Sequence, residues 1–189
     1  QERCEFFVNQ NREVHARFPV KAHHEVYRLD SDLFCEWLGK TFWESENKVP
    51  YEASIRSAIG TLSGIAKFKG DQQQVFLRIG KLEDRIFLDL ANDDWNCVEI
   101  TKHGWKVLNK PPVTFVRTPN MRSLPKPGKT NEIERLWRYL NVAQEERLLL
   151  LSWLVEFFRR DTPDPLLELT GEQGSGKSIT HNNIRVLID

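Results

Sequence analysis

The sequence has few cysteines and no excess of charge of either sign. Its 189 residues include three cysteines, whose odd number and wide separation fit neither a disulfide framework nor a zinc site. Lysine plus arginine and aspartate plus glutamate number 27 each, so the overall charge gives no argument for a nucleic-acid partner. We therefore expect a reducing, cytoplasmic location, and local motifs must indicate the function.

Long hydrophobic runs are also missing. The most apolar run, residues 148–158, is too short to cross a bilayer and contains Glu156, so it predicts a buried helix and no membrane partner. The first residues do not form a signal sequence. Because the chain also begins without methionine, we expect it to be part of a longer protein.

The first two thirds of the chain favour an α/β (α+β) accessory domain. Asp30 and Ser31 are candidate caps of a first helix, and Pro50 is a candidate first-turn residue of a second. From Gln74 the apolar period changes from helical to alternating, which predicts short strands at 75–79, 85–90, 96–101, 105–108 and 113–116. We expect an antiparallel meander packed on the two helices, with weaker strand signals at 6–8, 15–18 and 26–27.

The domain limits follow from proline content and helical spacing. Residues 1–118 form the predicted accessory domain, 119–130 a proline-rich linker, 131–161 a helical segment, and 162–189 the start of another domain. Two capping-box pairs, Asn131 with Glu134 and Asn141 with Gln144, predict two helices in the third segment. The second, over 142–160, is apolar nearly all round and is expected to be buried.

The strongest motif matches the phosphate-binding loop, in which glycine, four residues and a second glycine precede lysine and serine. Its residues are Gly171, Glu172, Gln173, Gly174, Ser175, Gly176, Lys177 and Ser178. Glycines allow main-chain amides to turn inward around a polyphosphate, the lysine supplies positive charge, and the serine hydroxyl is a Mg²⁺ ligand. We expect ATP and Mg²⁺ as ligands, with Ser178 on the metal.

The residues around this motif also fit a phosphate-binding loop. An apolar run at 165–170 predicts a buried strand, and Ile184, Leu187 and Ile188 predict a helix over 179–188. The alternative is a glycine-rich turn that binds nothing. Hydrolysis also needs an acidic residue on a second strand and a group that positions water, for which the chain has no room after the loop. No catalytic residue is therefore assigned.

Three weaker candidates have simpler alternatives. His23 and His24 invite a metal interpretation, but a solvated pair is favoured. Asp89, Asp93 and Asp94 could hold a cation, although residues 92–94 are more simply a turn.

The third weak candidate is a basic stretch near Phe115 and Trp137 that either contacts a phosphate backbone or is a solvated linker, the latter being favoured. Its basic residues are Lys110, Arg117, Arg122, Lys126 and Lys129.

The chain resembles a known family in the order of its elements, which are a helix pair, a proline-rich break, an apolar run and the phosphate loop. The resemblance also includes the upstream segments 75–79, 86–91, 98–100 and 104–107. The chain from about Leu29 onward is similar to the middle region of ATP-binding primase-helicase proteins of phages and mobile elements. These belong to the poxvirus-type superfamily-three helicase branch of the AAA+ ATPases. One departure is the polar run 181–183 after the loop, where the family has a more apolar helix start.

This resemblance implies a DNA helicase active in replication of the element. It implies a ring, expected to be a hexamer, that moves on single-stranded DNA, with Lys177 on the β- and γ-phosphates of ATP. The acidic, sensor, arginine-finger and DNA-contacting residues of the family would follow Asp189, and any primase site would precede Gln1. Two alternatives stay open: an ATP-binding scaffold or switch without helicase activity, for example in defence or assembly, and a structural piece whose loop is empty.

Overall fold

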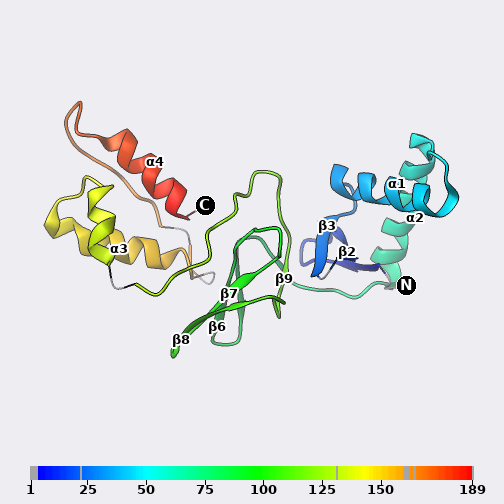
Figure 1. Cartoon of the computed structure of the whole chain (residues 1–189), viewed down its shortest axis with the longest axis horizontal. Helices are drawn as coiled ribbons and strands as arrows, with labels where there is room; N and C mark the ends of the chain where they lie inside the picture. Colours follow the sequence, from blue (N-terminus) through cyan, green and yellow to red (C-terminus); the bar gives the residue numbers. More distant parts are fainter. Residues whose placement is uncertain (1–3, 22, 131, 160–161, 164, 189) are drawn as a thin grey trace. The chain divides into compact units, whose positions relative to one another are not determined.

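The computed structural model describes residues 4–21, 23–130, 132–159, 162–163 and 165–188. They form a mixed α+β structure with antiparallel sheets and several helices (Figure 1). The chain divides into two compact units, Gln1–Asn120 and Met121–Asp189, each with its own hydrophobic core. The predicted mixed class is confirmed at this level, whereas the P-loop domain arrangement and the domain limits stay predictions.

The first unit opens with an antiparallel sheet of three strands. These are β1 (Glu5–Val8), β2 (Val14–Val20) and β3 (His23–Arg28), with β2 in the centre. Ala16 and Phe18 on one face of β2 belong to the cluster that includes the helices. On the other face, Phe7 and Val26 pack with Val116. A sheet buried on both faces loses the polar alternation that marks a strand, which explains why these strands were only weakly predicted.

Two helices cover one face of this sheet (Figure 1). They are α1 (Asp32–Glu46) and α2 (Glu52–Lys69), both close to their predicted positions. The Ser31 side chain caps α1 by accepting a hydrogen bond from the Phe34 amide at 3.3 Å, as expected. Pro50 precedes the N-cap of α2 rather than lying in its first turn, so that detail was wrong.

The predicted packing partner of these helices was also wrong. Phe34 of α1 and Ala66 of α2 pack against β2 of the N-terminal sheet, not against the later meander. The aromatic rings explain the choice: Phe18 of β2 stacks on Trp37 with centroids 4.2 Å apart. Contacts between aromatic rings add stability beyond that of burying apolar area. The side chains of β2 therefore determine which sheet the two helices pack against, and β2 lies where the strand signals of the sequence were weak.

A four-stranded antiparallel meander follows, in which three of the five predicted strands take part. Its strands are β5 (Ile79–Leu82), β6 (Arg85–Asp89), β7 (Cys97–Thr101) and β8 (Gly104–Leu108), paired in sequence order. The first hairpin turns tightly, since Leu82 pairs directly with Arg85. Two of the predicted strands therefore start later or end earlier than the apolar pattern indicated.

The remaining two predicted strands leave the meander. β4 (Val75–Phe76) and β9 (Thr114–Phe115) pair with each other in parallel. Their side chains explain the position: Phe76 and Phe115 pack in one cluster with Phe87 and Cys97 of the meander. Residues far apart in sequence are thus paired over one face of the meander, and local periodicity carries no signal for such pairing.

The second unit is helical in the described residues. It contains η1 (Ile133–Arg138), η2 (Gln144–Glu146), α3 (Arg147–Glu156) and α4 (Lys177–Ile188), of which η1 and η2 are short 3₁₀ helices. Its core joins three fully buried side chains, Leu140, Leu150 and Ile184. In the described residues of the whole chain, none of the helices combines the length and apolarity needed to cross a membrane.

Several helix predictions for this unit were wrong. The predicted helix over 142–160 is α-helical only from 147 to 156, and Leu148 and Leu149 are largely exposed rather than buried. The Asn141–Gln144 capping box does not form, because Ala143 is the N-cap of η2 and Asn141 bonds elsewhere. The predicted Asn131–Glu134 capping box depends on Asn131, which lies outside the described residues, and the N-cap of η1 is Glu132.

The expected strand before the loop is absent from residues 165–170. A strand requires a hydrogen-bonded neighbour, and no described segment pairs with this run. Leu166 is 95% exposed, while Leu167 reaches the core of the unit. The helix predicted over 179–188 is confirmed and begins two residues earlier, with Ile184 buried and Leu187 half exposed.

Candidate functional site

The loop between residues 171 and 176 is closed rather than splayed. Gly174 and Gly176 have φ angles of 83° and 79°, a region that residues with a Cβ rarely adopt. At Gly171 a Cβ would lie 2.9 Å from the Ser175 hydroxyl oxygen, so the loop also needs glycine for close approach. The Ser175 amide donates to the Glu172 carbonyl at 3.3 Å, which completes the turn. The positive φ angles account for glycine at these positions, and their role around a polyphosphate stays a prediction.

The Lys177 side chain folds back into this turn. Its Nζ donates hydrogen bonds to the carbonyls of Gly171 at 2.8 Å and Glu172 at 2.6 Å, and lies 3.4 Å from the Ser175 hydroxyl. No described carboxylate is paired with this amine. The positive charge is therefore held by neutral carbonyls, which an incoming phosphate can replace without breaking an ion pair.

Ser178 follows Lys177 in the first turn of α4 and is exposed. The first amides of a helix have no partner within the helix and carry partial positive charge, which favours an anion. Glu172, Gln173 and Gly174 are exposed along the outside of the turn. The eight predicted residues therefore form one continuous structure around Lys177, and whether it holds ATP and Mg²⁺ stays a prediction.

Asn141 is a further residue of this site that sequence reasoning assigned to another role. Its side-chain amide donates to the Ser175 carbonyl at 2.8 Å, and its main-chain amide donates to the hydroxyl of buried Thr180 at 3.3 Å. Asn183 on α4 donates to the Tyr139 carbonyl at 2.7 Å. The polar run after the loop, a departure from the resembled family, thus fastens α4 to the segment around residue 140.

The Asn141–Ser175 bond predicts a positioning role that can be measured. We expect Asn141→Ala to weaken Mg-ATP binding, because the loop loses one hydrogen bond that fixes its closed form. One such bond contributes about 0.5–1.5 kcal/mol, which is roughly 2- to 12-fold in Kd. Displacement of a fluorescent ATP analogue measures this change. Asn182→Ala is the matched control, since Asn182 is exposed on α4 without a partner in the described chain, and equal affinities would contradict the assignment.

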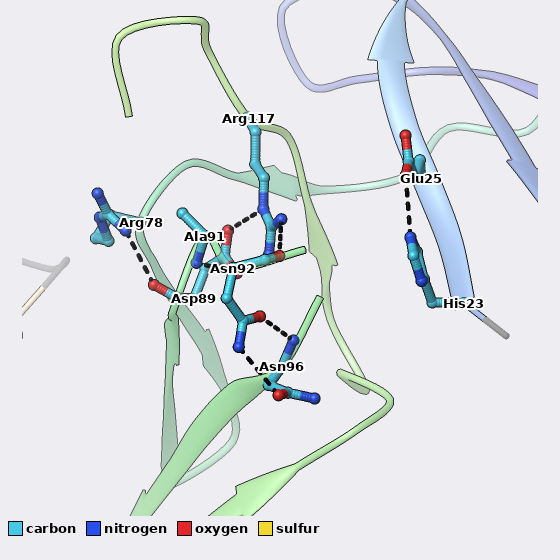
Figure 2. Close-up of polar contacts among 8 residues, drawn as sticks. All are labelled: His23, Glu25, Arg78, Asp89, Ala91, Asn92, Asn96 and Arg117. Atoms are coloured by element: carbon cyan, nitrogen blue, oxygen red, sulfur yellow. Dashed lines mark hydrogen bonds and ion pairs between the residues drawn. The ribbon is translucent and has the colours of Figure 1, made fainter. Parts of the chain in front are cut away.

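The aspartates of the first unit do not form a cation site. Asp89 is buried, and its carboxylate accepts bonds from Arg117 Nε at 2.9 Å and Nη2 at 2.7 Å (Figure 2). Arg117 also donates to the Asn92 carbonyl at 2.6 Å, and its guanidinium lies 3.9 Å from the centroid of the Trp95 ring. Asp93 and Asp94 lie in a turn, as the simpler interpretation held. Asp89 is therefore half of a structural ion pair.

The histidine pair is only partly solvated. His24 is exposed, but His23 is largely buried, with Nε2 3.0 Å from the Glu25 carboxylate (Figure 2) and its ring stacked on Trp95. The expectation that both are solvated was wrong for His23. Glu25 lies two residues further along the strand and therefore on the same face of the sheet, where its carboxylate contacts the His23 ring. In the described ranges, no group of three or more metal-ligating side chains occurs.

The basic stretch loses two of its predicted members. Arg117 is committed to Asp89, and Phe115 is buried in the core below the meander, so neither is available to a phosphate backbone. Lys110 and Lys129 are exposed. Arg117 and Phe115 therefore do not support the phosphate-backbone alternative, and the favoured solvated linker stays a prediction for the other basic residues.

The cysteines offer no activated nucleophile. Burial raises the pKa of the Cys97 thiol to about 12, and burial and the Glu5 charge raise that of Cys4 to about 12. A thiol that stays protonated at neutral pH is a poor nucleophile and a poor metal ligand. All three cysteines are free.

Comparison with known proteins adds no assignment to this geometry. No protein-family model matches the chain, and neither a curated protein nor a solved structure is significantly similar to it. The case for a function therefore depends on the loop and its surroundings alone.

Proposed function

We propose that the chain binds the triphosphate of ATP with Mg²⁺ through residues 171–178. The observation that supports this most directly is the closed turn with the Lys177 amine inside it, held by two main-chain carbonyls. A polyphosphate can replace these carbonyls with charge-assisted bonds, while the first amides of α4 contribute further donors. In this proposal Ser178, which lies in the first turn of α4, supplies the hydroxyl ligand of Mg²⁺.

The resemblance extends this proposal to the activity of a DNA helicase of the primase-helicase type. In this proposal, the loop belongs to an ATPase that works as a ring on single-stranded DNA in replication of a phage or mobile element. The loop contributes only the binding of the nucleotide phosphates. The accessory unit, with its three sheets and two helices, is compatible with this arrangement but does not select it.

The nucleotide proposal is tested by displacing a fluorescent ATP analogue from this chain with Mg-ATP, Mg-ADP and AMP. We expect Mg-ATP to compete at least tenfold better than AMP, since the loop contacts the β- and γ-phosphates that AMP lacks. We also expect chelation of Mg²⁺ to weaken ATP binding. Equal competition by AMP, or the absence of analogue binding, would overturn the proposal in favour of an empty loop.

The helicase proposal needs a separate measurement on a protein that contains this chain together with the expected hydrolytic residues. Its ATP hydrolysis rate is measured with and without single-stranded DNA. Stimulation by DNA supports a motor. A rate that is indifferent to DNA favours the ATP-binding scaffold or switch.

A further inference from the structure

A second candidate site lies in the first unit, far along the sequence from the phosphate loop. It is a cavity of about 410 Å³ at the start of β3, lined from strands β1 to β3, from Trp95 and from residues 109–115. This volume lies in the range of small-ligand sites. We name it the cationic cavity, after Arg17 and Lys110, whose side chains line it together with that of His24.

The charge on its walls is mainly positive. Glu5 is the acidic side chain that lines it, and this carboxylate is 3.2 Å from Arg17 and 60% exposed, so water screens the pair. Lys110 and His24 are both exposed, and neither has a partner among the residues that the structure describes. Unpaired donors beside a cavity favour an anion, and Lys110 and His24 can turn toward one without breaking an existing bond.

Arg17 is held in place before any ligand arrives. One of its terminal nitrogens, Nη2, donates to the Thr114 hydroxyl at 2.5 Å and to the Gln73 side-chain oxygen at 3.1 Å. Its guanidinium lies 5.5 Å from the centroid of the Phe7 ring. A fixed cation loses little conformational entropy on binding, so Arg17 is prepared for a ligand while Lys110 and His24 are adaptable.

The rest of the wall is mostly apolar, with Asn109, Thr114 and His23 as its polar members. Pro111, Pro112, Val26 and Val113 line it, together with Trp95, which is buried between the Arg117 guanidinium and the His23 ring. Figure 2 shows two contacts that hold this region, the bonds of Arg117 to Asp89 and Asn92 and the hydrogen bond between His23 and Glu25. A ligand that fits must therefore combine an anionic group with a flat or apolar group.

We propose that the cationic cavity binds one nucleotide unit of a single-stranded nucleic acid. The phosphate lies between Lys110, His24 and Arg17, and the sugar and base lie against the prolines and valines. A nucleotide combines the two properties of the wall, a phosphate anion and a flat ring, whereas an acidic peptide offers charge without the ring. This inference is independent of the proposed ATP loop.

The test is the fluorescence anisotropy of a short labelled oligothymidylate titrated with this chain. We expect Lys110→Glu to weaken binding about tenfold and Lys110→Ala to lower the slope of log Kd against log salt concentration by about one. Lys102→Glu is the matched control, since Lys102 is exposed in the β7–β8 turn without a partner in the described residues. This control is expected to change affinity less than twofold.

Competition separates the sources of the nucleotide. Displacement of the label by free thymidine monophosphate assigns the cavity to free nucleotides as well as strands, and displacement by unlabelled strands alone assigns it to strands. Both results support the proposal, provided that Lys110→Glu weakens binding of the oligothymidylate more than Lys102→Glu does. Absence of binding, equal weakening by Lys110→Glu and Lys102→Glu, or equal displacement by an acidic peptide overturns it.

Discussion

Lys177→Ala is expected to weaken Mg-ATP binding by roughly 10- to 100-fold. A hydrogen bond to a charged group contributes about 1.5–3 kcal/mol, and the alanine side chain cannot replace the amine at the β- and γ-phosphates. The fold should survive, because Nζ bonds only to carbonyls and a hydroxyl of the loop itself and alanine is a good helix former at the start of α4. Isothermal titration with Mg-ATP measures the effect.

Lys129→Ala is the matched control for this experiment. Lys129 lies in the same unit, is exposed, and has no partner in the described part of the chain. Removing it lowers the net charge by the same amount, so a general electrostatic effect would appear in both variants. If the two variants bind Mg-ATP equally well, the amine inside the loop does not contact the nucleotide and the proposed function fails.

Arg117→Met is expected to lower the free energy of unfolding by about 3–5 kcal/mol. It leaves the Asp89 carboxylate, 1% exposed, without the two bonds at 2.9 and 2.7 Å that now compensate its burial. It also removes the cation stacked on Trp95 and the bond to the Asn92 carbonyl. Urea denaturation, followed by far-ultraviolet circular dichroism, measures the change in the midpoint at constant slope.

Two further variants separate a buried pair from a surface pair. Arg56→Met breaks an ion pair with Glu52 whose partners are 77% and 78% exposed, and is expected to change stability by less than about 1 kcal/mol. The double variant Asp89→Asn with Arg117→Met is expected to recover part of the loss, because no buried charge is then left unpaired. If Arg117→Met and Arg56→Met lower the free energy of unfolding equally, the buried ion pair contributes no more to stability than the exposed one.

Sequence patterns predicted the elements whose stability is local. The apolar stripe of α2 and the alternation of β6 and β7 depend on residues close together in the chain, and both elements lie where expected. β2 was poorly defined because both of its faces are buried, which removes the polar positions that mark a strand. The β4–β9 pair was missed because it depends on packing between distant residues, which no local period reports.

The same distinction applies to the candidate site. The glycines and Lys177 were found because their spacing is fixed by the loop itself. Asn141 was assigned to a cap instead, since its bond to Ser175 spans 34 positions and asparagine is equally common at helix starts. Lys110 was grouped with its neighbours in sequence, whereas the structure places it beside Arg17 and His24.

The bonds around Asn141 make the loop sensitive to residues that never touch a ligand. Leu140, its neighbour in the chain, is buried against Leu150 and Ile184, so the position of the asparagine amide depends on the packing of this small core. Substitutions that loosen the contact of α3 with α4 would shift the Ser175 carbonyl. Substitutions at apolar positions well outside the phosphate-binding motif can therefore change the affinity of the loop for its ligand.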